Sequence, residues 1–384
     1  MTQQSSFSMP AINLFGQGTI NEAGTRLKDV GAKKTLLVTD EGLYQLGIAN
    51  TIADIIKAAG VEVEIYPKAE PNPTDQNVAD GVDAYKAANC DSLVSLGGGS
   101  SHDAAKGIGL VVSNGGTIHD YEGVDKSKNP LVPLIAINTT AGTASEMTKF
   151  TIITDVKRHV KMAIIDKHVT PLVSINDPAL MVGLPPALTA ATGLDALTHA
   201  IEAYVSTAAT PMTDACAEKV FELIPEFLPR AFANGHDMEA REQMVYAQFL
   251  AGMAFNNASL GYVHAIAHQM GGFYNLPHGV CNAILLPHVC HYNLVGREDR
   301  FAKIAAYLGE SVDGLSKREA AEKGIAAIER LAKDLNIPSG FEELGAKHED
   351  IQTLAENAMK DVTAATNPRK PKLEEVMEII RQAM

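Results

Sequence analysis

The first half of the chain alternates short apolar, β-branched runs with amphipathic stretches. The runs predict buried strands within 35–40, 61–66, 92–100 and 133–138. The stretches between them have the apolar spacing of helices, at 43–60, 75–88 and 101–112. Strands that alternate with helices at this spacing indicate a parallel sheet covered by helices on both faces.

The pattern changes within residues 181–205. From Pro186 onward the apolar positions follow the helical period, and almost no strand pattern remains. Proline suits the first turn of a helix, so a helix is expected to begin there. We therefore predict an α/β domain over 1–184 and an all-helical domain over 185–384, and a chain of 384 residues is long enough for two domains.

Composition and charge exclude several classes of partner. The formal net charge of −14 disfavours binding to nucleic acid or to an anionic membrane. No apolar run approaches the about 20 residues of a membrane span. The first ten residues lack the pattern of a signal peptide, so we expect a cytoplasmic protein. The four cysteines show no CxxC spacing, which favours reduced thiols over a thiolate metal site.

A triple glycine, Gly97 to Gly99, separates a predicted strand from a helix that begins near Ser101. Glycines let the backbone approach a ligand closely, and the free N–H groups at a helix start attract phosphate. A plain tight turn is the alternative. The pattern favours a pyrophosphate-binding loop.

A second glycine pair, Gly16 and Gly18, begins a dinucleotide fingerprint. Asn21 occupies the third glycine position, however, and no strong strand is predicted before the pair. We interpret this segment as a false match.

Asp40, which ends the strand at 35–40, either bonds an adenosine ribose, favouring NAD over NADP, or caps the next element. The loop 138–146 offers hydroxyls to a polar ligand, or is only a connector.

Polar residues at helical spacing mark a candidate metal site in the second half. Asp195 and His199 stand four apart and share one helix face, and Glu202 falls on the same face. His264 and His268 repeat the spacing of four, and His278 follows a turn at 275–277.

A carboxylate with two or three imidazoles suits Fe²⁺ or Zn²⁺. The lack of cysteine ligands favours a catalytic site with an open position over a closed structural one. The alternative is that each histidine is an ordinary core residue. Two such pairs in otherwise apolar helices favour the metal site.

Four motifs together resemble the iron-containing (group III) alcohol dehydrogenase family, and the resemblance runs essentially end to end. The motifs are GGGSSHDAAK, TTAGTASEMT, ATGLDALTHAIEAY and GYVHAIAHQMGGFYNLPHGVCNAILLPHV. Within the family the chain is similar to the bacterial iron-activated ethanol dehydrogenases. The resemblance implies that NAD binds the α/β domain and the metal binds the helical domain.

The resemblance also implies roles for individual residues. The metal ligands it implies are Asp195, His199, His264 and His278. It places His268 near the nicotinamide as a proton relay or orienting group, and Glu202 is not a ligand in it. The cofactor positions it implies are Asp40, Gly97, Gly98, Gly99, Ser100, Thr139, Thr140, Thr143 and Lys161.

Two positions depart from the family pattern. Ser101-His102 stands where many members carry proline after the serine, which leaves the backbone donors intact. Phe150 aligns with an asparagine of the lactaldehyde/propanediol branch. We interpret Phe150 and Phe255 as walls of an apolar pocket for short alkyl alcohols, with ordinary core packing as the alternative.

The activity implied is hydride transfer between an ethanol-like primary alcohol and NAD, with iron, or zinc, as the Lewis acid, in a homodimer. Propanediol, lactaldehyde or methanol dehydrogenases of the same family are alternatives. A lyase similar to dehydroquinate synthase is a distant one, because an anionic substrate needs several cations. Residues 181–280 offer only Lys219, Arg230 and Arg241. A non-catalytic NAD-binding scaffold is the last alternative.

Overall fold

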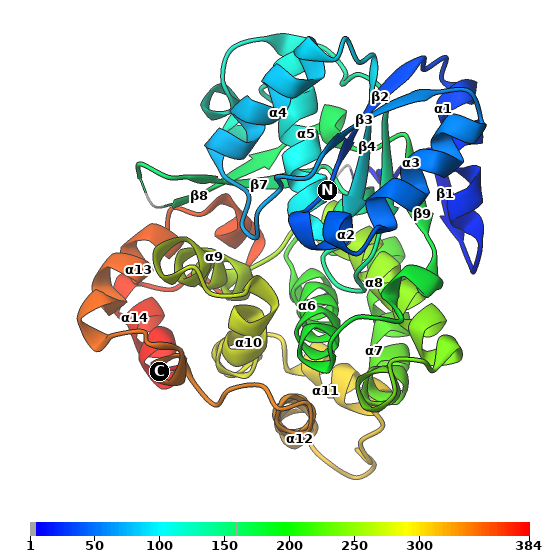
Figure 1. The fold of residues 1–384 in the computed structure, drawn as a ribbon. Coiled ribbons are helices and arrows are strands. Elements are labelled where there is room, and N and C mark those ends of the chain that lie inside the picture. The colour runs from blue at the N-terminus through cyan, green and yellow to red at the C-terminus, as the bar shows by residue number, and fades with distance from the viewer. Residues whose placement is uncertain (1–4, 159) are drawn as a thin grey trace. The chain divides into compact units, whose positions relative to one another are not determined.

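The computed structural model describes residues 5–158 and 160–384, which form two compact units (Figure 1). The α/β unit comprises Met9–Thr140 and Ala144–Val182. The helical unit comprises Gly183–Met384, the short segment Ala141–Thr143 and the described residues up to Ser8.

The α/β unit is built on a parallel sheet of six strands within the described residues, in the order β1-β9-β6-β4-β2-β3. The strands are β1 (Ile12–Phe15), β2 (Lys34–Val38), β3 (Glu62–Tyr66), β4 (Ser92–Gly97), β6 (Leu134–Asn138) and β9 (Val173–Asn176). The four strands predicted from the sequence are β2, β3, β4 and β6, so the prediction of a parallel α/β sheet is confirmed.

Helices cover both faces of this sheet because successive side chains of a strand point to opposite sides. Leu36 and Val38 of β2 pack in one apolar core with α4 (Asp75–Ala87) and α5 (Gly99–Asn114), and Leu37 packs in the other with α1 (Ala23–Asp29) and α3 (Ile48–Ala58). In Figure 1 these two pairs of helices lie on opposite sides of the strands. The α/β helices are α1 (Ala23–Asp29), α2 (Glu41–Gln45), α3 (Ile48–Ala58), α4 (Asp75–Ala87) and α5 (Gly99–Asn114).

The single helix predicted over 43–60 is wrong. The structure has two helices there, α2 and α3, separated at Gly47. Gly47 has a φ of 76°, a left-handed conformation that breaks the helical hydrogen-bond pattern. The apolar period continues across the break, so the pattern alone did not reveal it.

A second, small sheet was not predicted. Its strands are β5 (Gly123–Val124), β7 (Phe150–Asp155) and β8 (Val160–Ile165), in the order β5-β8-β7 with an antiparallel β7–β8 pair. Short 3₁₀ turns connect the elements of both units: η1 (Thr19–Glu22), η2 (Ile118–Tyr121), η3 (Ser145–Met147), η4 (Lys167–Val169), η5 (Pro178–Met181), η6 (Phe341–Leu344), η7 (His348–Asp350) and η8 (Val362–Thr366).

The helical unit contains no strand among the residues that the structure describes. Its helices are α6 (Pro186–Val205), α7 (Pro211–Ala233), α8 (Met238–Ala258), α9 (Tyr262–Tyr274), α10 (His278–Leu294), α11 (Glu298–Tyr307), α12 (Lys317–Asp334), α13 (Ile351–Ala358) and α14 (Leu373–Gln382). Every residue of α6 from Thr189 to Val205 is buried, since α7, α8 and α10 pack around it. The polar side chains of α6 therefore need partners inside the protein.

Across the described residues, each helix is too short or too polar to span a lipid bilayer. The four cysteines, all in the described part, are thiols without a disulfide.

Candidate functional site

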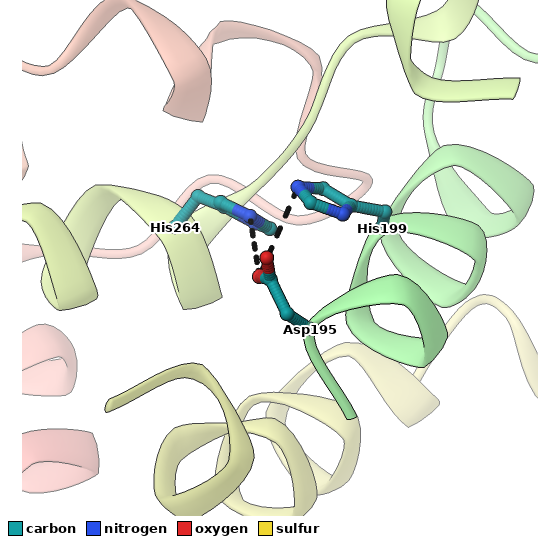
Figure 2. A group of neighbouring side chains, drawn as sticks. All are labelled: Asp195, His199 and His264. Atoms are coloured by element: carbon teal, nitrogen blue, oxygen red, sulfur yellow. Dashed lines mark ion pairs between the residues drawn. The ribbon is translucent and has the colours of Figure 1, made fainter. Parts of the chain in front are cut away.

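Three imidazoles converge on one carboxylate oxygen in the helical unit. The Nε2 atoms of His199, His264 and His278 lie 3.9, 3.8 and 3.7 Å from Oδ1 of Asp195. Figure 2 shows Asp195 and His199 on one helix, with His264 reaching toward the same carboxylate from another. The ligand atoms of Asp195, His199 and His264 all lie within 4.8 Å of one another.

Three helices, α6, α9 and α10, supply the four side chains of the cluster. Asp195 and His199 are one turn apart on α6, so their side chains point the same way. His264 lies in the first turn of α9, and His278 begins α10 after the turn that follows α9. The side chain of His278 is 25% exposed, whereas that of Asp195 is 2% exposed, so His278 lies on the solvent side of the cluster.

The donor set fits a divalent metal ion. Ligand atoms around a tetrahedral ion with bonds of about 2.1 Å lie about 3.4 Å apart, slightly less than the separations from Asp195 Oδ1. The carboxamide Nδ2 of Asn282 lies 2.6 Å from Oδ1 of Asp195 and 3.1 Å from Nε2 of both His264 and His278. An amide nitrogen has two hydrogens and cannot satisfy three acceptors together. A cation would satisfy all of them.

The surroundings favour the neutral form of the His199 imidazole, which is the form that binds a metal. Phe255 of α8 stacks on His199 with ring centroids 4.2 Å apart and an interplanar angle of 17°. Burial lowers the pKa of His199 to about 4. This position of Phe255 suits the predicted apolar wall, which stays a prediction.

Glu202 lies on the opposite side of His264 from the cluster. Its Oε2 is 2.6 Å from Nδ1 of His264, and its Oε1 accepts a hydrogen bond from the Val263 N–H at 2.7 Å. Burial raises the pKa of Glu202 to about 7. Glu202 therefore contacts a predicted ligand, and does not point its carboxylate at the converging Nε2 atoms.

His268 is next to the cluster but has a different partner. Its Nδ1 lies 2.8 Å from Oδ2 of Asp361, and its ring stacks on His278 at 5.5 Å between centroids. Burial alone would raise the pKa of Asp361, but His268 and the donors of Thr363 outweigh it and hold that pKa below its usual range. A buried carboxylate thus orients the imidazole of His268.

Asp40 and the triple glycine, which are among the predicted cofactor positions, lie at the switch point of the sheet in the α/β unit. From β2 the chain runs to β3 on one side, and from β3 it crosses back to β4 on the other side of β2. Ligands bind at the carboxyl ends of strands where the order reverses in this way. Asp40 follows β2 and Gly97 ends β4. A Cβ on Gly97 would lie 3.6 Å from Oδ2 of Asp40, so the two are neighbours.

The start of α5 leaves backbone donors for an anion. Gly98, its N-cap, supplies no side-chain hydrogen bond, and α5 runs for 16 residues. The Thr139 N–H donates to the Gly97 carbonyl at 3.0 Å, and a Cβ on Gly98 would lie 3.0 Å from the Thr140 side chain. The triple-glycine loop and Thr139–Thr140 are therefore in contact.

Other predicted residues are more scattered. Asp40 caps α2, because its Oδ1 accepts a hydrogen bond from the Leu43 N–H at 2.9 Å. This is the helix-capping role that the sequence offered as the alternative to ribose binding. Phe150 and Lys161 lie on β7 and β8 of the small sheet. Thr143 belongs to the helical unit, whereas Thr139 and Thr140 belong to the α/β unit. Phe150 is buried, at 7% exposed.

The turn at Gly16 and Gly18 follows a short strand, β1, where no strong strand was predicted. That strand has only four residues and lies at the sheet edge, which explains its weak pattern. The N–H of Gly18 donates to Oδ2 of Asp177 at 2.8 Å, as the Ile20 N–H does at 3.4 Å. The carboxylate of Asp177 therefore already accepts hydrogen bonds from the backbone N–H groups that a phosphate would need.

His102, at the departure from the family pattern, gives a pH prediction. Burial is the largest cause that lowers the pKa of His102 from 6.5 to about 3, and its Nδ1 lies 2.7 Å from Ser95 Oγ. Below pH 6.5 the unfolded chain gains a proton that the folded one does not, so this histidine removes stability as the pH falls toward 3. We expect His102→Gln to reduce the loss of unfolding free energy between pH 6.5 and 5 by about 1–2 kcal/mol.

Urea unfolding at both pH values measures this difference. His291→Gln is the matched control, because the side chain of His291 is 51% exposed. Equal acid sensitivity in His102→Gln and the control would contradict the prediction.

Sequence reasoning missed two polar residues of the site. Asn282 lies in the long histidine-containing run, one turn after His278, but amides between apolar residues are common in helices. Asp361 is far from His268 in sequence, and no spacing rule connects them. Only Asn282 had a signal, its position four residues after His278 on the same helix.

Comparison with known proteins covers both halves of the chain. Residues 10–178 match the family described as iron-containing alcohol dehydrogenase, and residues 189–384 match the C-terminal region of the Fe-containing alcohol dehydrogenase family. The NAD-dependent methanol dehydrogenase of Bacillus methanolicus is 54% identical over 99% of this chain and 100% of its own length.

Two further relatives cover nearly the whole chain. Alcohol dehydrogenase 4 of Schizosaccharomyces pombe is 54% identical over 99% of this chain and 89% of its own. A crystal structure of 1,3-propanediol oxidoreductase superposes with a TM-score of 0.97 at 49% identity, covering 100% of both chains. The chain therefore belongs to the iron-containing alcohol dehydrogenase family.

Proposed function

We propose that this protein is an NAD-dependent, iron-dependent dehydrogenase that interconverts short primary alcohols and aldehydes. The observation that carries the proposal is the convergence of three Nε2 atoms on Asp195 Oδ1 inside an apolar helical unit. The family description supports iron, although zinc accepts the same nitrogen and oxygen ligands.

In this proposal Asp195, His199, His264 and His278 hold the metal, and the α5 start with Asp40 holds NAD. When bound, the metal supplies Lewis acidity that lowers the pKa of an alcohol, and NAD accepts a hydride. Asp195 contributes the negative charge of the ligand set. Phe255, flat against His199, excludes water from that side of the site.

His268 is proposed to move or orient the alcohol proton. Asp361 holds its Nδ1, so the other ring nitrogen, Nε2, is the one available for proton exchange. Because His268 stacks on His278, its ring lies next to the proposed metal ligands without pointing its Nδ1 at them.

A lyase acting on a highly anionic substrate is less well supported. The three fixed cations of residues 181–280 already have partners within the helical unit. Lys219 pairs with Glu222, Arg230 with Asp237 and Glu239, and Arg241 donates to Gly235 and Thr189.

Metal reconstitution with a series of alcohols tests the proposal. Metal-free protein is loaded anaerobically with Fe²⁺ or Zn²⁺, and NADH formation is followed with ethanol, other primary alcohols and 1,2-propanediol. We expect activity to depend on the metal and to be greatest with short primary alcohols, since the predicted pocket wall carries Phe150 in place of a polar side chain.

Two results would contradict the proposal at different levels. NAD binding without alcohol-dependent NADH formation under either metal would favour the non-catalytic scaffold. A kcat/KM for 1,2-propanediol above that for ethanol would remove the ethanol-like preference and leave the dehydrogenase. Homodimeric assembly and a cytoplasmic location stay predictions.

A further inference from the structure

The imidazole of His264 lies between two buried carboxylates. Its Nδ1 is 2.6 Å from Oε2 of Glu202, and its Nε2 is 3.8 Å from Oδ1 of Asp195. Both side chains that flank the ring are at most 3% exposed. A carboxylate accepts hydrogen bonds, so the contact with Glu202 places the ring proton on Nδ1 and leaves the Nε2 lone pair toward Asp195.

The same carboxylate caps the helix that carries His264. Helix α9 has no side-chain cap at Gly261, and Oε1 of Glu202 accepts from the Val263 N–H at 2.7 Å in its first turn. The N-terminal end of a helix stabilises a negative charge. Glu202 therefore connects α6 to the first turn of α9, the turn that carries His264.

The glycine at position 261 leaves room for this close approach. A Cβ at Gly261 would lie 2.9 Å from Oε1 of Glu202 and 2.7 Å from Oδ1 of Asn367. Helix α6 thus supplies two proposed ligands, Asp195 and His199, and seven residues after Asp195 a carboxylate aimed at a third ligand on another helix.

We propose that Glu202 is a positioning residue that fixes the ring orientation and Nδ1–H tautomer of His264 and thereby strengthens metal binding. The inference rests on the proposed metal site, since it assigns Glu202 a role only toward His264 as a ligand. Carboxylates that bond the far nitrogen of a metal-ligating histidine raise its basicity, and their loss weakens metal binding about 10–100-fold.

Glu202→Gln tests the inference, because it keeps the size of the side chain and removes the charge. The matched control is Glu218→Gln on α7, which also removes a carboxylate that accepts a hydrogen bond from a side chain of another helix, here Tyr204 of α6 at 2.7 Å. The dissociation constants for Fe²⁺ and Zn²⁺ are measured by competition with a chelator, and the melting temperature of each metal-free protein is measured separately.

We expect the metal dissociation constant to rise about 10–100-fold in Glu202→Gln and to stay within twofold of wild type in Glu218→Gln. An unchanged constant together with a lower melting temperature of the metal-free variant would overturn the inference, since Glu202 would then only cap α9. If Glu202→Gln does not fold, Glu202→Asp replaces it. That variant keeps the charge but is one methylene shorter, so weaker metal binding supports the inference and wild-type binding overturns it.

The first arm, wild-type protein with each metal, separates this inference from the proposed function. Failure of the wild type to bind Fe²⁺ or Zn²⁺ defeats both the metal site and the inference. Tight binding by the wild type and by Glu202→Gln alike defeats the inference alone.

Discussion

Asp195→Ala is expected to lose the bound metal and to lower kcat/KM for alcohol oxidation by about 10³-fold or more, because Lewis-acid catalysis supplies several kcal/mol and each 1.36 kcal/mol is a factor of ten. Among the described residues, Asp195 is the only one with a carboxylate oxygen, Oδ1, that lies within 4 Å of all three Nε2 atoms. Without it, three neutral imidazoles would face one another around a buried cation with no compensating charge.

Two measurements check this prediction: metal per chain after desalting, by mass spectrometry, and kcat/KM with NAD and a short alcohol. Asp313→Ala is the control, since Asp313 is exposed in the same unit. Full metal content and near wild-type kcat/KM in Asp195→Ala would show that the residue is not a ligand. A melting temperature for the metal-free variant at or above that of metal-free wild type would exclude misfolding as the cause of a loss.

Asp40→Ser is expected to shift the ratio of kcat/KM for NADP to that for NAD upward by about 10²-fold, because juxtaposed like charges cost several kcal/mol. A carboxylate at this strand end favours NAD, because it accepts a hydrogen bond from the ribose 2′-hydroxyl of NAD and repels the 2′-phosphate of NADP. Asp40 also caps α2 through the Leu43 N–H, and serine is a good N-cap, so the helix should survive the change.

Initial rates with both cofactors at one saturating alcohol concentration measure the ratio. Asp80→Ser serves as the control, because Asp80 is exposed on α4 of the same unit. An unchanged ratio in Asp40→Ser, with an unchanged melting temperature, would leave Asp40 with a capping role alone.

The main elements of the fold follow from the hydrophobic pattern. Continuous apolar runs predict strands buried on both faces, and the side chains of β2 do divide between two cores. The pattern was weakest where strands are short or lie at an edge. β1 has four residues at the sheet edge, and the β5-β8-β7 sheet consists of a hairpin and a two-residue strand.

Site residues were predictable to the extent that they share one helix or one turn. Asp195 and His199 lie one turn apart on α6, and the triple glycine lies between β4 and α5. Residue-level reasoning alone kept Glu202 as a rival ligand, since helical spacing gives it the same face as Asp195. In the structure, the carboxylate of Glu202 instead contacts the Val263 N–H and Nδ1 of His264 in the first turn of α9.

The sequence by itself determined which residues share a face: two i, i+4 pairs of polar groups on apolar helices, and a glycine turn after a buried strand. Only the tertiary structure decided which faces meet. It brings α9 and α10 to Asp195, assigns Asp361 to His268 and Glu202 to His264, and inserts Asn282 among the ligand atoms. The physical reason is that helical period orients side chains about one axis, whereas the packing of helices against one another, which depends on contacts far apart in sequence, sets the distances between axes.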